Sequence, residues 1–312
     1  MDVISLWFVL AYVLYAECIA GVIVNVIIVT ANIIKWKTMK SLNTGDKILS
    51  SLATSICLYL SVSFLIYLSS IFHLQDDKDQ LFIFSLLFVS TFLHFTNLWF
   101  ATVLCVFYCV KITSYSWKFF IFLKTKISTL VPWFLLASMV ISISSSLPFG
   151  LGYNGIQVQN LTNVSMGNMN ISRDMEYEDQ LQSYEKSKYL LLIISCPPFV
   201  VFCVVGFLLL HSLWMHIRRM KSSGSGFRSP NLESHFKAVK SMGLFLVLET
   251  VYFLVASYSY AACHGNITGY WIAIIVTCSP PVLHSLYIIS SNNELKKTFV
   301  SMFHVLKCCA QV

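Results

Sequence analysis

Charged residues are scarce in this chain. They make up 11% of its 312 residues, whereas 57% of the residues are hydrophobic. Soluble globular domains carry roughly a quarter of their residues as Asp, Glu, Lys and Arg. The low charge excludes an ordinary water-soluble fold, so most of the molecular surface must face lipid.

The motifs of several enzyme classes are also missing. The sequence contains no Gly-rich phosphate loop, no His-Glu-x-x-His zinc motif, no Cys-x-x-Cys pair and no intramembrane Gly-x-Ser-x-Gly. No second His or carboxylate stands at metal-ligand spacing from His94. We therefore expect no enzyme, no cofactor and no metal site, and no basic motif indicates a nucleic-acid partner.

Long apolar runs dominate the chain instead. A helix needs about 20 mostly apolar residues to cross the hydrocarbon core of a bilayer. Seven stretches meet this length, near residues 4–34, 46–73, 81–112, 128–149, 189–216, 240–262 and 269–291. The sequence thus predicts an all-α fold, with one seven-helix membrane domain over 1–312, an outer loop at 150–188 and a tail at 292–312.

The distribution of charge predicts the orientation of this bundle. Most of the 21 lysines and arginines fall in connections that are cytoplasmic if the N-terminus is outside and the C-terminus inside. Four Asn-x-Ser/Thr glycosylation triplets fall in connections assigned to the outside, at Asn160, Asn163, Asn170 and Asn266. The net charge of +7 is therefore concentrated at the inner face, where it suits anionic membrane lipid and an acidic or polar cytosolic partner.

Ionisable side chains inside the spans need a physical reason, because each costs about 2.5–3.5 kcal/mol at mid-bilayer on insertion scales. Glu17, Gly21 and Asn25 form a polar and small stripe on one face of the first helix, which favours contact with other helices over contact with lipid. This stripe is either structural, or Glu17 touches a ligand or a cation. His94 is a candidate pocket wall, and Glu249 shares a helix face with Tyr252.

Short motifs at the helix ends resemble the bitter taste receptors, also called taste receptors type 2. The most specific run lies in the third helix, as Leu-Trp-Phe-Ala-Thr at 98–102 followed by Val-Phe-Tyr-Cys-Val-Lys-Ile at 106–112. Similar matches occur at Glu17-x3-Gly21-x3-Asn25, Leu52-Ala53-x-Ser55, Pro198-Phe199, Tyr252-Phe253 and His284-Ser285. The resemblance runs nearly end to end, with the motifs in order.

Several absences point the same way. The third helix ends without an acid-Arg-Tyr triplet, the seventh has His284-Ser285 in place of Asn-Pro, and the 150–188 loop has no cysteine. One departure from the family pattern is Ile56, which stands where an arginine is common. We therefore expect the polar network around Asn25 to be rewired or weaker than in other members.

The resemblance implies a multi-pass plasma-membrane receptor for small bitter compounds. Its agonist pocket would lie in the outer half of the bundle, with Ser90, Thr91, His94, Glu249, Tyr252 and Ile274 as wall residues. A gustducin-like or Gi-type heterotrimeric G protein would bind near Tyr108, Lys111, His216, His235, Lys240 and Lys296. Glu17, Asn25, His284 and Ser285 would form a structural polar network.

Two other functions are consistent with the same pattern. A vomeronasal-type pheromone receptor has the same topology. Pro197-Pro198 and Pro280-Pro281 interrupt two of the predicted helices, and small membrane carriers also use interrupted helices, although no internal repeat is visible here. A receptor activates a G protein when its agonist is added, whereas a carrier shows saturable uptake. The sequence leaves open whether the chain forms homo- or hetero-oligomers.

Overall fold

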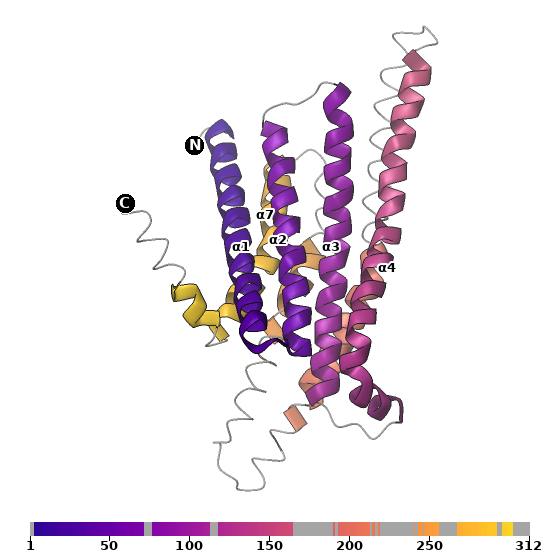
Figure 1. The fold of residues 1–312 in the computed structure, drawn as a ribbon. Coiled ribbons are helices and arrows are strands. Elements are labelled where there is room, and N and C mark those ends of the chain that lie inside the picture. The colour runs from indigo at the N-terminus through magenta and orange to yellow at the C-terminus, as the bar shows by residue number, and fades with distance from the viewer. Residues whose placement is uncertain are drawn as a thin grey trace.

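The computed structural model of the chain is helical in the part that it describes, apart from the connection at 40–43, and contains no strand in those residues. The described residues are 3–71, 77–112, 118–164, 190, 193–212, 214–215, 218, 240, 243–244, 246–255, 267–291 and 295–301. The labelled helices are α1 (Val3–Met39), α2 (Thr44–Ile71), α3 (Asp77–Ile112), α4 (Lys118–Val164) and α7 (Ile267–Ser291). Two further segments, Ile193–Ser212 and Leu246–Val255, complete the bundle in Figure 1, and a short helix at 295–301 follows α7.

Five of the described helices are long and apolar enough to cross a membrane. The spans are Phe8–Met39, Thr44–Ser69, Ser85–Lys111, Phe120–Leu147 and Ile193–Ser212. Lipid offers no hydrogen-bond partner to the backbone, so each crossing segment must form its own helical bonds. The all-α prediction is therefore confirmed for the described part of the chain.

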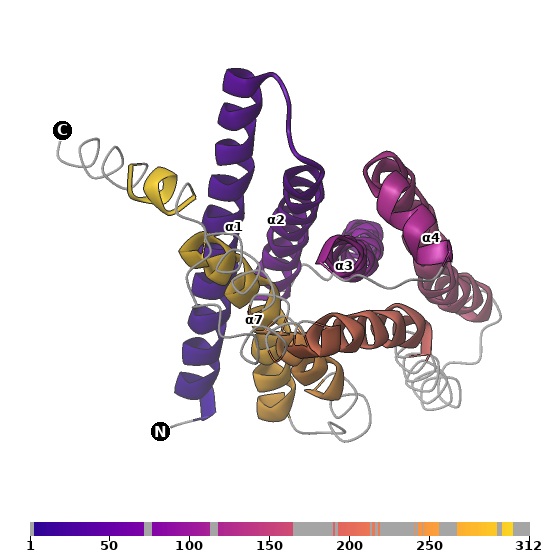
Figure 2. The same ribbon diagram turned by 90° about the horizontal axis from the view of Figure 1, so that it is seen from below.

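The helices pack in chain order around the bundle. Helix α1 contacts α2 and α7, α2 contacts α3, and α3 contacts α4; Figure 2 shows this succession from below. The 193–212 helix approaches α3 at Gly206. A Cβ atom built on Gly206 would lie 4.0 Å from Cys105 Sγ of α3. Helix α3 has the most buried of the five spans and α4 the least, so α3 lies inside the bundle and α4 at its edge.

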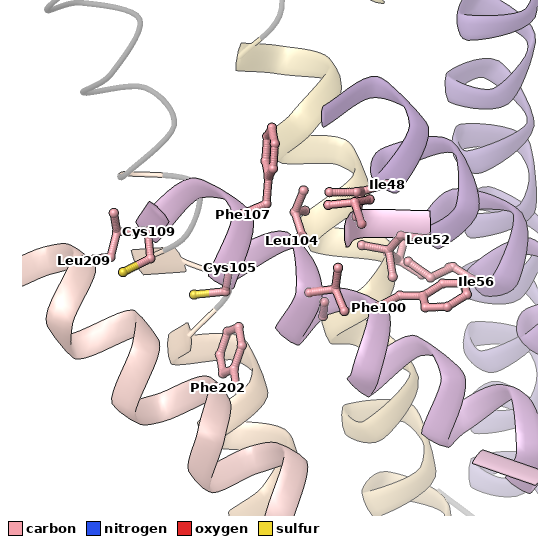
Figure 3. Close-up of a cluster of buried hydrophobic side chains, with 14 of the residues drawn as sticks. Ile48, Leu52, Ile56, Phe100, Leu104, Cys105, Phe107, Cys109, Phe202 and Leu209 are labelled. Atoms are coloured by element: carbon pink, nitrogen blue, oxygen red, sulfur yellow. The ribbon is translucent and has the colours of Figure 1, made fainter. Parts of the chain in front are cut away.

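An apolar cluster on both sides of α3 holds the bundle together. Figure 3 shows Ile48, Leu52 and Ile56 of α2 close to Phe100 and Leu104 of α3. On the other side of α3, Cys105 and Cys109 approach Phe202 and Leu209 of the 193–212 helix. All of these side chains are buried. This packing fixes the position of α3 relative to two neighbouring helices.

Helix α4 is longer than the apolar run that crosses the membrane. It begins at Lys118 and ends at Val164, so it extends past the expected range 128–149 at both ends and includes residues expected in the outer loop. Hydropathy marks where a helix leaves lipid and does not mark where its backbone bonds stop. Lys124 and Lys126 therefore lie within the helix and do not precede it.

Small side chains on α4 face the protein. Ser138, Ser142 and Ser146 are buried, and their hydroxyls donate to backbone oxygens one turn earlier, at distances of 2.6, 2.7 and 2.8 Å. These bonds satisfy each hydroxyl within its own helix, which lets a polar group lie inside the bundle. The opposite face carries exposed apolar residues such as Trp133 and Val140, as expected for a lipid-facing surface.

Candidate functional site

A hydrogen bond joins α3 to the 246–255 helix. The Tyr252 hydroxyl lies 3.0 Å from His94 Nε2 and 3.4 Å from Nδ1, and the two ring centroids are 5.2 Å apart. Both residues are half-buried. The imidazole tautomer decides whether Tyr252 donates or accepts. In either case, one polar contact links two helices that are far apart in the sequence.

Aromatic rings surround this contact. Tyr59 of α2 lies with its ring centroid 6.2 Å from that of His94, and Phe95 lies 5.5 Å away. Next to Tyr252, Phe253 stacks on Phe199 of the 193–212 helix with centroids 4.4 Å apart and planes 2° from parallel. The site is therefore built from four helices and combines polar tips with apolar ring faces.

Sequence reasoning missed the aromatic partners Tyr59 and Phe253. Tyr59 carries a hydroxyl inside an apolar span, which is a signal for an inward-facing position, but an isolated sequence cannot show which helix it faces. The Phe199–Phe253 stack depends on two helices more than fifty residues apart. Such pairings follow from the packing of the bundle and not from local periodicity.

The remaining residues of the predicted wall are placed as follows. Ser90 and Thr91 of α3 are half-buried, and the Thr91 hydroxyl donates to Leu87 O at 2.8 Å. Glu249 is half-buried and lies three residues before Tyr252 in the same helix. Ile274 belongs to α7, and its side chain lies outside the described part. Of the six residues, the structure thus joins His94 and Tyr252 directly.

This arrangement suits binding more than catalysis. An imidazole and a phenol offer one or two hydrogen bonds to a ligand, and the rings around them offer apolar contact. Within the described residues, no group of three His, Cys, Asp or Glu side chains could hold a metal ion. The site therefore combines polar tips with apolar ring faces, a chemistry that suits a small amphipathic ligand.

A second polar cluster lies between α1 and α7. The Ser285 hydroxyl is 2.9 Å from Asn25 Oδ1, and Asn25 Nδ2 donates to Gly21 O at 2.8 Å. Asn25, Ser285 and His284 are buried, and Glu17 approaches the hydroxyl of Ser279. Glu17, Asn25 and Ser285 of the expected structural network thus lie along the interface of α1 and α7, and His284 is buried next to Ser285 in the chain.

Ile56 explains how this network is arranged without a cation. The Ile56 side chain is 3% exposed and packs in the apolar cluster of Figure 3 with Leu52 and Phe100. A buried arginine here would need several partners, whereas isoleucine needs none. Asn25 bonds to Ser285.

The residues expected to contact a G protein are only partly described. Tyr108 is half-buried, and its ring meets Phe107 edge-on at 5.6 Å. Lys111 is exposed, with its Nζ 5.3 Å from the Phe107 ring centroid. Lys240 and Lys296 are exposed. His216 and His235 lie outside the described residues.

The glycosylation triplets are likewise only partly described. Asn160 and Asn163 belong to α4, with side chains outside the described part, and Asn170 and Asn266 lie outside the described residues altogether. A helical backbone at Asn160 differs from the loop that the sequence predicted there.

The bundle and its internal polar contacts define a multi-pass helical membrane protein of the seven-helix receptor class. Residues 2–307 match the family model described as taste receptor protein (TAS2R). The chain belongs to the taste receptor type 2 family, a family of receptors. This membership confirms the predicted family and the seven-helix fold class.

Relatives from several animals match the chain over nearly its full length. Taste receptor type 2 member 8 of Homo sapiens is 30% identical over 316 aligned residues, covering 95% of both chains. Member 39 of Mus musculus is 29% identical, covering 96% of this chain and 92% of its own. Member 40 of Gallus gallus is also 29% identical, with 95% and 94% covered.

Proposed function

We propose that the protein is a bitter-taste chemoreceptor of the plasma membrane, with its N-terminus outside the cell. A small bitter agonist would bind beside His94 and Tyr252, and the receptor would activate a gustducin-like or Gi-type G protein. Family membership supports the receptor function. The hydrogen bond between His94 and Tyr252 is the observation that supports this location for the agonist.

The bond gives an agonist a physical means of changing the bundle. A ligand that bonds to either partner replaces the contact between α3 and the 246–255 helix, and the two helices are then free to separate. Interhelical hydrogen bonds in membranes contribute about 0.6–1.7 kcal/mol. Losing about 1 kcal/mol shifts a two-state equilibrium roughly five-fold, which is a useful signal for a receptor.

The G protein would respond to a rearrangement of these helices at the end of the bundle that carries Tyr108. Tyr108 lies fourteen residues beyond His94 on α3, about 21 Å away at 1.5 Å per residue. We propose that Tyr108, Lys111, His216, His235, Lys240 and Lys296 contribute to G-protein contact. Their positive charge suits an acidic or polar partner surface.

The test is calcium release in cells that express the full chain with a promiscuous gustducin-type α-subunit. The cells are exposed to a panel of bitter compounds. His94→Ala and Tyr252→Ala should lower agonist potency, because each removes a ligand contact. Responses must require the α-subunit, and surface expression must match that of the unmodified receptor.

Tyr252→Phe tests the bond itself, because it removes only the hydroxyl. Because loss of the bond frees the two helices, Tyr252→Phe should raise agonist-free signalling about five-fold. The double variant with His94→Ala should show no further rise, since both changes remove the same bond. Tyr12→Phe is the matched control, since Tyr12 is 71% exposed. Additive effects of Tyr252→Phe and His94→Ala would contradict the role of the bond.

The two remaining functions are separate outcomes of the same experiment. Silence toward every bitter compound despite normal surface expression would favour a vomeronasal-type pheromone receptor, tested next with pheromone extracts. Saturable uptake of a labelled compound without any G protein would favour a carrier. Either result would contradict the proposed function.

A further inference from the structure

A cavity of about 240 Å³ lies where α1, α2 and the 295–301 helix meet. It is formed by the end of α1, the start of α2 and residues such as Leu295 and Thr298. In Figure 1 these three elements meet at one end of the bundle, where the short helix lies in yellow. The cavity is separate from the site around His94 and Tyr252, to which it contributes no residue.

The inner wall of this cavity is polar and held in place by bonds. Lys35 Nζ lies 2.9 Å from Asp46 Oδ2, and both side chains are half-buried. Asn32 Nδ2 donates to Ser50 Oγ at 2.8 Å, and the Ser50 hydroxyl donates to Asp46 O at 2.8 Å. These contacts fix a lysine ammonium, which has three hydrogen-bond donors, at the edge of the cavity.

The outer wall is apolar and exposed at the surface of the bundle. Ile34 and Met39 line the cavity and are 53% and 64% exposed. Trp36, between them in the sequence, is also exposed, and tryptophan is enriched at the level of lipid headgroups. The cavity therefore combines an ammonium group, which suits a negatively charged headgroup, with an apolar entrance, which suits hydrocarbon tails.

The charge around the cavity is strongly positive. Its neighbourhood carries further exposed lysines, at Lys37, Lys40, Lys47, Lys296 and Lys297. Asp46 balances only the charge of Lys35. Basic pockets between membrane helices are known to attract anionic lipid headgroups.

From this arrangement we propose that the cavity binds the headgroup of an anionic phospholipid, with Lys35 contacting the phosphate. Drug-sized ligands occupy pockets of roughly 300–1,000 Å³, so the smaller volume here suits a headgroup. The acyl chains lie along Ile34 and Met39. A lipid held in this way links α1, α2 and the 295–301 helix, and the proposed orientation places it in the cytoplasmic leaflet.

The test uses the purified full chain in phosphatidylcholine nanodiscs that contain increasing fractions of dioleoylphosphatidylglycerol. Native mass spectrometry counts the phosphatidylglycerol retained by each receptor. Lys35→Gln should weaken retention about five-fold, the effect of one lysine beside an anionic headgroup. Asp46→Asn should strengthen retention by a similar factor, because it removes a repelling carboxylate.

The opposite signs separate lipid binding from loss of fold. Both substitutions break the same ion pair and should lower the apparent unfolding temperature together, but they should move lipid retention in opposite directions. Lys126→Gln is the matched control, since it removes an exposed lysine from α4 and should leave retention unchanged.

Three results would overturn the proposal. Lys126→Gln could weaken retention as much as Lys35→Gln, which would indicate general attraction of lipid by positive charge. Asp46→Asn could weaken retention as Lys35→Gln does, which would indicate a purely structural ion pair. Glycerol phosphate could displace the lipid at equal concentration, which would indicate a site for soluble phosphate.

Discussion

Gly21 lies where α1, α2 and α7 meet, and its lack of a side chain makes their packing possible. A Cβ at this position would overlap Leu60 Cδ1 of α2 and would lie 2.7 Å from Val282 Cγ2 of α7. Carbon atoms pack best at about 3.5–4.0 Å. With Gly21→Ala, the Leu60 and Val282 side chains, or the helices that carry them, must therefore move by about 1 Å. We expect a loss of about 1–3 kcal/mol in the free energy of unfolding, the usual cost of overpacking a core.

The measurement is the apparent unfolding temperature of the purified receptor, followed through the accessibility of its buried thiols. Gly206→Ala is the matched control, since its Cβ would lie 3.4 Å from Leu246 Cδ1 at an ordinary contact distance. Alanine favours the helix over glycine by about 1 kcal/mol at both positions. Gly206→Ala should therefore be neutral or stabilising.

A compensating change tests the cause of the loss. Leu60→Ala removes the side chain that meets the new methyl group, so Gly21→Ala combined with Leu60→Ala should cost less than the sum of the two single changes. The reasoning is refuted if Gly21→Ala unfolds at the same temperature as Gly206→Ala, or if the two changes add.

Two further predictions concern the interface of α1 and α7. Ser285→Ala leaves Asn25 Oδ1 without its donor, so it should cost about 0.6–1.7 kcal/mol and lower the unfolding temperature. The thiols of Cys18 and Cys278 interact across the same interface and are free. A copper–phenanthroline oxidant should therefore join them, so that a receptor cut by a protease in the 219–239 connection migrates as one band on a non-reducing gel.

Each of these predictions has a control. Ser285 also donates to Pro281 O of its own helix at 2.8 Å. Ser290→Ala removes an exposed hydroxyl that donates to Tyr287 O of the same helix, and it should leave the unfolding temperature unchanged. Cys278→Ser should separate the two fragments on the gel, whereas Cys203→Ser should not. Equal loss in Ser285→Ala and Ser290→Ala, or two bands from the oxidised unmodified receptor, would contradict the described packing of α1 against α7.

Hydropathy predicts the helical class of this protein because the bilayer imposes one length on every crossing segment. It predicts helix ends less well, as α4 shows. The lysines near its start are compatible with a helix that continues into water, and nothing apolar is needed for residues 150–164 to remain helical. The apolar run ends where the chain leaves the hydrocarbon, whereas the helix ends where its backbone hydrogen bonds stop, and the two positions need not coincide.

The polar pairings could be predicted only in part. The stripe of Glu17, Gly21 and Asn25 indicates an inward face of α1, since polar and small residues avoid lipid. That Asn25 bonds to Ser285 depends on the register of α1 against α7. The cavity beside Lys35 depends on three elements that meet from opposite ends of the chain, and single-helix patterns contain no information about such meetings.

The contrast between α3 and α4 has a consequence for how the protein tolerates variation. Most of α3 is surrounded by protein, whereas α4 rests on the bundle mainly through one face. A library of single substitutions should therefore lose surface expression on every side of 85–111. Across 120–147 the losses should follow the serine stripe at 138, 142 and 146, while the lipid face accepts exchange among apolar residues. Substitutions on the lipid face of α4 should therefore be tolerated, whereas a substitution in α3 should require a compensating change in a helix that packs against it.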